Sequence, residues 1–168
     1  MEPLRELLGV DHRQTLEFFY TSLQEHVDPS VDRDELLYNA SVLAHHAQVS
    51  TQAGSDVPTP ANLSEVFDTF VFDQSQNHDG VMLETAGAQC LLLAGFFEDQ
   101  MRRRHRIEWY ARLGAGFYQR AAAFERSHRK ARLLASLSRH FELWRETQAQ
   151  LGRSLRDNPY LLSIEDSD

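Results

Sequence analysis

One carboxylate and one imidazole are the side chains best suited to chemistry in this sequence. Glu125 and His128 stand three positions apart, which places both on one face of a helix. A ferritin-like di-iron site needs two such pairs and a glutamate from each of two further helices. The chain has no second Glu-x-x-His pair, and Glu84 adds only one further carboxylate. Glu84, Glu125 and His128 are therefore weak metal candidates, and we expect no metal or cofactor.

These three residues also have simpler explanations. An exposed turn between two helices accounts for Glu125 and His128 better than a ligand pair does. The helix dipole accounts equally well for Glu84, because acidic residues stabilise the first turn of a helix.

Nucleophilic catalysis has one candidate, Cys90 in "AQCLLLAGFF". A cysteine among leucines is typical of an inert core residue, because burial disfavours the reactive thiolate. The chain has neither a Gly-x-Ser-x-Gly elbow nor a Walker loop. Gly114 and Gly116 lie inside a helical pattern, where they favour helix packing over phosphate binding. We predict no catalytic residues, and the sequence disfavours an enzyme without excluding one.

The distribution of positive charge is more unusual than any catalytic motif. The formal net charge of the chain is −8, yet its basic residues are concentrated in one half. Residues 1–99 hold 3 arginines against 17 acidic residues, whereas residues 100–156 hold 14 basic residues against 4 acidic ones. Two clusters carry much of this charge: Arg102, Arg103, Arg104 and Arg106, and then Arg126, Arg129, Lys130 and Arg132. We treat both clusters as candidate sites for a partner or an anion.

Three interpretations of this charge segregation stay open. The two halves compensate each other within one molecule, the basic half binds nucleic acid or another polyanion, or the charged surfaces bind a protein, including a second copy of this chain. The two clusters lie at opposite ends of a helix about 27 Å long, which disfavours docking on a duplex. Our first hypothesis is a non-enzymatic protein that acts through protein–protein interaction, and a nucleic-acid-associated regulator is the alternative. A metal- or ligand-binding helical bundle centred on Glu84, Glu125 and His128 is the third hypothesis.

The elements that must position these residues are helical throughout. A capping box at Asp32 and Glu35 indicates the start of the second helix, and Gly87 and Gly95 indicate a closely approaching neighbour. The pattern predicts helices over 13–27, 33–49, 62–71, 81–101 and 107–124, and a last one from about 130 to Pro159.

The fold class that follows is all-α, a bundle-like domain of five to six helices over 1–158, with a short acidic tail at 159–168. The most apolar run is 17 residues long and includes Glu84, so it predicts a buried helix and no membrane association. The N-terminal residues lack the pattern of a secretory signal, and the single cysteine fits a reducing compartment. We therefore expect a cytoplasmic protein.

The block "ETAGAQCLLLAGFFEDQMRRRHRIEWYARLGAGFYQRAA", residues 84–122, resembles a block found in uncharacterised all-helical proteins of proteobacteria. The matching residues are Gly95, Phe96, Phe97, Arg103, Arg104, Trp109, Tyr110, Leu113, Gly114 and Tyr118. The resemblance implies a compact all-α cytosolic domain. It also singles out Arg103, Arg104, Tyr110 and Tyr118, which form either a buried Arg–Tyr hydrogen-bond network or a small anion site at a helix end.

Overall fold

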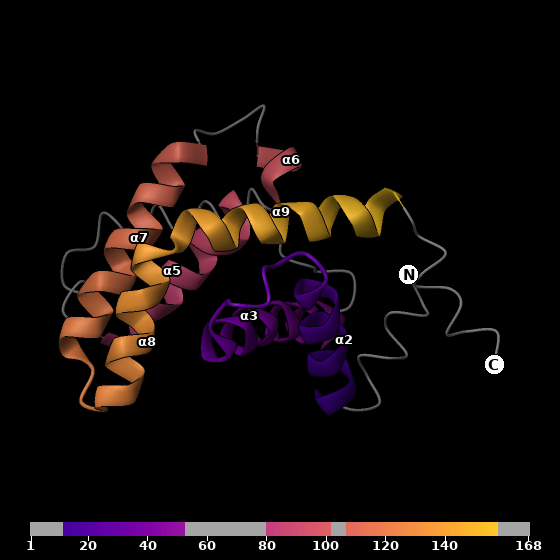
Figure 1. The fold of residues 1–168 in the computed structure, drawn as a ribbon. Helices are drawn as coiled ribbons and strands as arrows, with labels where there is room; N and C mark the ends of the chain where they lie inside the picture. Colours follow the sequence, from indigo (N-terminus) through magenta and orange to yellow (C-terminus); the bar gives the residue numbers. More distant parts are fainter. Residues whose placement is uncertain (1–11, 53–79, 102–106, 158–168) are drawn as a thin grey trace. The chain divides into compact units, whose positions relative to one another are not determined.

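The computed structural model describes residues 12–52, 80–101 and 107–157, and every element in these ranges is a helix (Figure 1). The predicted all-α fold class is confirmed. The chain divides into two compact units, one formed by residues 1–57 and 150–168 and the other by residues 58–149. The extent of a single domain stays a prediction. The predicted helix over 62–71 and the acidic tail lie outside the described residues.

The first unit contains two helices that pack on each other, α2 (His12–Gln24) and α3 (Arg33–Gln52). Phe19 and Leu23 of α2 are buried, as are Leu36, Ala40 and Leu43 of α3. The predicted cap of α3 is confirmed, because Asp32 Oδ1 accepts hydrogen bonds from the backbone N–H groups of Asp34 at 2.7 Å and Glu35 at 3.3 Å.

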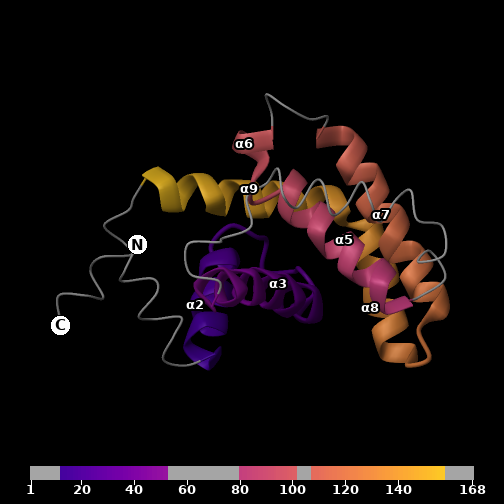
Figure 2. The same ribbon diagram turned by 180° about the vertical axis from the view of Figure 1, so that it is seen from behind.

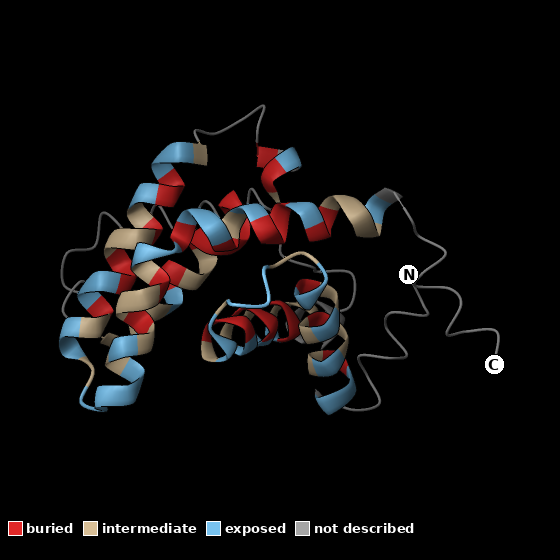
Figure 3. Ribbon diagram, viewed as in Figure 1, coloured by how far each residue is buried: buried red, intermediate tan, exposed pale blue. Residues whose placement is uncertain are grey.

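The second unit is built around α5 (Gly80–Ala94), which is buried along most of its length (Figure 3). The prediction of one helix over 81–101 is wrong. The chain turns at residues 95–97 and resumes as the short α6 (Glu98–Met101). A Cβ on Gly95 would lie 3.0 Å from Gln148 Cβ and 3.1 Å from the carbonyl oxygen of Arg145. The turn therefore coincides with a close approach of another helix.

Helix α7 (Ile107–Phe124) has the predicted bounds and packs lengthwise on α5, as Figures 1 and 2 both show. Two glycines bring neighbouring elements close to each other. A Cβ on Gly87 would lie 3.1 Å from the Tyr118 ring, and one on Gly114 would collide with the Phe141 ring. The predicted close approach at Gly87 and the predicted packing role of Gly114 are confirmed. Gly116 is different, because a Cβ there would meet nothing within 4 Å.

The expected last helix is two helices, α8 (His128–Arg139) and α9 (Phe141–Asp157), separated at His140. Leu134, Leu137 and Phe141 are buried on both sides of the break, so the apolar pattern continues through it and does not reveal it. Helix α8 packs on α7, and Ser138 Oγ ties them by donating to the carbonyl oxygen of Ala115 at 2.6 Å. Residues 141–149 of α9 belong to the second unit and residues 150–157 to the first.

Candidate functional site: the α7–α8 groove

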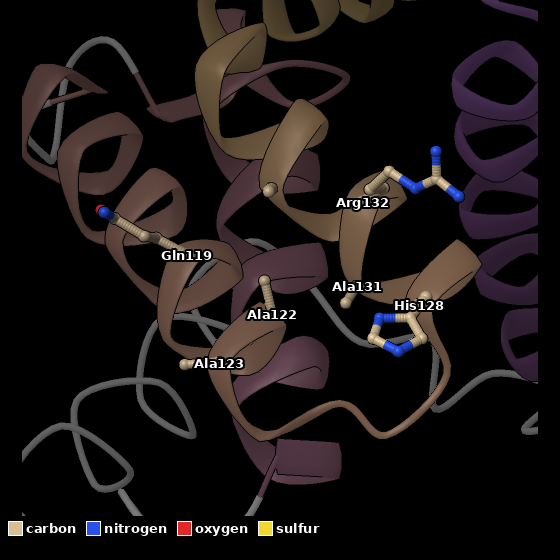
Figure 4. Close-up of a pocket in the computed structure, with 7 residues that line it drawn as sticks. Gln119, Ala122, Ala123, His128, Ala131 and Arg132 are labelled. Carbon is tan, nitrogen blue, oxygen red and sulfur yellow. The ribbon is translucent and has the colours of Figure 1, made fainter.

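A shallow groove of about 580 Å³, widely open to solvent, lies between α7 and α8 (Figure 4). Alanine predominates in its lining. The groove exists because these small side chains on two facing helices leave space that larger ones would fill. We call it the α7–α8 groove, and its lining residues are Gln119, Ala122, Ala123, His128, Ala131, Arg132 and Ala135. Figure 4 shows Gln119 of α7 and Arg132 of α8 on opposite sides of the alanines.

The groove lies in a basic region of the chain. Residues 107–139 hold seven arginine and lysine side chains and two glutamates. Arg126, in the connection just before α8, and Arg132 are exposed. In the part of the chain that the structure describes, neither of them forms an ion pair with a carboxylate. Arg132 lines the groove itself, and Arg126 lies two positions before His128 of its lining.

Lys130 belongs to the same sequence cluster but has a different environment. Its Nζ lies 3.1 Å from Glu84 Oε2 and 3.7 Å from Glu125 Oε2. The hydrogen bond to Glu84 is the largest cause that raises the pKa of the Lys130 ammonium. Ser127 caps α8, since its side chain accepts from the Lys130 backbone N–H at 3.4 Å. Lys130 therefore holds the start of α8 against α5, and its charge is paired with the carboxylates of Glu84 and Glu125.

The structure thus brings two of the three metal candidates together, around an ammonium group. Glu84 and Glu125 converge on Lys130, whereas His128 is exposed and lines the α7–α8 groove. Among the described residues, no group of three or more His, Cys, Asp or Glu side chains could hold a metal ion. Cys90 is fully buried, and burial raises the pKa of its thiol well above the usual value.

The first arginine cluster, Arg102 to Arg106, lies outside the described residues. Two members of the expected Arg–Tyr network are described, and both are buried: Tyr110 is 2% exposed and Tyr118 is 0% exposed. The network and the alternative anion site both stay predictions.

Glu98 of α6 forms an ion pair with Arg145 of α9 at 3.3 Å. Sequence reasoning missed this pair because the two residues are 47 positions apart. It also missed the alanines of the groove. The spacing of Ala131 and Ala135, one helical turn apart, was the available signal.

Within the described residues, no helix is both long and apolar enough to cross a lipid bilayer. No protein-family model matches this chain, and no match was found among curated proteins or solved structures. The geometry of the site is therefore the basis for any functional inference.

Proposed function

We propose that this protein is a non-enzymatic, cytoplasmic binding protein, and that its α7–α8 groove takes an acidic segment of a protein partner. One observation carries the proposal. Arg126 and Arg132 present exposed charge, unpaired by any described carboxylate, beside a groove lined by alanines. Arginine is suited to this role, because its planar guanidinium binds carboxylates with two parallel hydrogen bonds.

The small lining residues favour a polypeptide as the occupant. A groove with an alanine floor lets a backbone or a helix approach closely, and apolar contact then adds to the charge attraction. Nucleic acid is less well matched, because binding to single strands usually relies on aromatic side chains that stack on bases. The groove lining contains no aromatic residue other than His128.

The proposal is tested by fluorescence anisotropy with the full chain. The probe is a labelled acidic amphipathic peptide of about four helical turns, and a single-stranded oligonucleotide of equal charge is the comparator. We expect the peptide to bind, and to bind more weakly as salt rises from about 50 to about 300 mM, because screening weakens exposed charge pairs.

Two kinds of variant separate charge from shape. Arg126→Gln with Arg132→Gln should weaken peptide binding about tenfold, since two exposed charge contacts are lost. Ala131→Leu should weaken it by filling the groove without changing the charge. The matched control, Arg33→Gln with Arg112→Gln, removes the same charge, and Arg112 lies about 15 Å along α7 from Ala122.

The control should leave the affinity within about twofold, since neither arginine lines the groove and Arg112 lies farther from it along α7 than the screening length of about 10 Å. Equal weakening by both double variants would mean that net charge alone drives binding, and the groove would lose its role. Tighter binding of the oligonucleotide than of the peptide would favour the nucleic-acid alternative.

A further inference from the structure

The same chain carries an exposed acidic surface that suits the α7–α8 groove. Residues 12–52 hold six acidic residues and two arginines. The connection from α2 to α3 is exposed at Glu25, Asp28, Pro29, Ser30 and Asp32. We call this connection, residues 25–32, the acidic turn.

Hydrogen bonds within the acidic turn fix its shape before any partner binds. Asp28 Oδ1 accepts from the Ser30 backbone N–H at 2.8 Å, and Asp32 Oδ1 caps α3. The hydrogen bonds from Ser30 also lower the pKa of the Asp28 carboxyl, so it stays ionised to a lower pH than an ordinary aspartate does. A preformed turn loses little conformational entropy when it binds.

We infer that the acidic turn of one copy of this chain enters the α7–α8 groove of a second copy. The inference rests on the proposed function, because it names the partner of the same groove. Charge complementarity carries it. Glu25, Asp28 and Asp32 lie on the turn, whereas Arg132 lines the groove and Arg126 lies two positions before His128 of the lining. Shape agrees, since Pro29 and Ser30 are compact residues and alanines line the groove.

The geometry of such a contact sets the form of the assembly. The groove and the acidic turn are different surfaces, so each copy offers one of each and the contact is heterologous. Copies would therefore join head to tail, into an open chain or a closed ring. A single turn in a groove buries little area, so the contact is weak and depends on protein concentration and salt.

The first test measures the mass of the full chain in solution by light scattering coupled to size exclusion. The chain mass is 19.4 kDa. We expect the weight-average mass to rise above this value with protein concentration at low salt, and to return to it at high salt. A monomer at every concentration and salt would overturn the inference.

A complementation experiment tests which surfaces meet. One variant, Glu25→Gln with Asp28→Asn, neutralises the acidic turn but keeps the side-chain oxygen that accepts from Ser30. The other, Arg126→Gln with Arg132→Gln, neutralises the groove. Each alone should be monomeric. Mixed at equal amounts they should give a 1:1 dimer that grows no further, because one copy supplies an intact turn and the other an intact groove.

A matched control neutralises two exposed acids elsewhere, Glu108→Gln with Glu146→Gln, and should self-associate like the unaltered chain. Mixed variants that stay monomeric, or single variants that still associate, would overturn the inference. Binding of the acidic peptide by a chain that never self-associates would overturn this inference alone. Loss of peptide binding as well would remove the proposed function.

Discussion

The Nζ atom of Lys130 lies 3.1 Å from Glu84 Oε2, and the same ammonium group is the point on which Glu125 also converges. Two of the three residues that the sequence offered as metal candidates thus surround a lysine. The finding separates the basic residues of the α7–α8 region into two kinds. Lys130 joins the start of α8 to α5, whereas Arg126 and Arg132 are exposed and pair with no carboxylate in the described part of the chain.

The Glu84–Lys130 pair should contribute modestly to stability, because the Lys130 side chain is 45% exposed and solvent screens it. A double-mutant cycle with Glu84→Gln and Lys130→Met should give a coupling free energy below about 1 kcal/mol that falls with added salt. A cycle with Glu125→Gln should give a smaller coupling, since its distance is longer. Equal couplings in both cycles would contradict this ranking.

The Lys130 pair should also have a pH signature. The pKa of Lys130 is raised above its ordinary value of 10.5, so the folded state holds the proton more tightly than the unfolded chain does. Its contribution to the free energy of unfolding is therefore complete below pH 10.5 and is lost as pH rises through the folded pKa. Urea denaturation over this range should show a steeper loss for the unaltered chain than for Lys130→Met.

Glycine substitutions in α7 should separate close packing from open surface. Gly114→Ala places a Cβ against the Phe141 ring and 2.6 Å from Cys90 Cβ, so unfolding should become easier by about 1–3 kcal/mol. Gly116→Ala, two positions away, has no neighbour within 4 Å and should stabilise the helix by up to about 1 kcal/mol. Urea denaturation measures both, and destabilisation by Gly116→Ala would show that its surroundings are not open.

Arg145 pairs with two glutamates that should differ in their effect on stability. Hydrogen bonds to Glu142 are the largest cause that raises the pKa of Arg145, yet the Glu142 side chain is 63% exposed and that of Glu98 is 10% exposed. Burial decides the free energy, because water replaces an exposed partner easily. Glu98→Gln should therefore cost about 1–2 kcal/mol and Glu142→Gln about 0.5 kcal/mol or less. The reverse order, in thermal or urea unfolding, would contradict this.

His46 should make the chain less stable in mild acid. Burial, with a smaller contribution from the neighbouring His45, lowers the pKa of His46 below 6.5. The unfolded chain therefore binds this proton more readily, so the contribution of His46 is complete above pH 6.5 and falls as pH drops. The variant His46→Gln should lose less stability than the unaltered chain between about pH 7.5 and about pH 5. His45→Gln, at an exposed position, should keep most of this acid sensitivity, because burial is the larger cause of the lowered pKa of His46.

Periodicity predicted the helices well where one apolar face continued to the end of an element. The bounds 107–124 and the cap at Asp32 depend on local spacing and local hydrogen bonds, and both are confirmed. The breaks at Gly95 and His140 were missed, because the apolar positions on both sides keep the same spacing. Such breaks depend on tertiary approach, as at Gly95 against Gln148, which no local window contains.

The charged residues of the candidate site could be predicted from the sequence, but its shape could not. The arginines Arg126 and Arg132 were found from composition, since clustered charge is visible in the sequence itself. The concavity beside them was not, because it depends on which alanines of two helices face each other. The pairing of Lys130 with Glu84 was missed for the same reason, as the two residues lie 46 positions apart in the sequence.

The division of the chain into units has a consequence for biosynthesis. One unit takes residues from both sides of the other, which occupies the continuous stretch 58–149. A ribosome completes that stretch before it adds residues 150–157, the final part of α9. Domains generally fold as units during synthesis. The unit of residues 58–149 is therefore synthesised in full before the other unit receives residues 150–157. A nascent chain truncated at residue 149 would leave α2 and α3 without this part of α9.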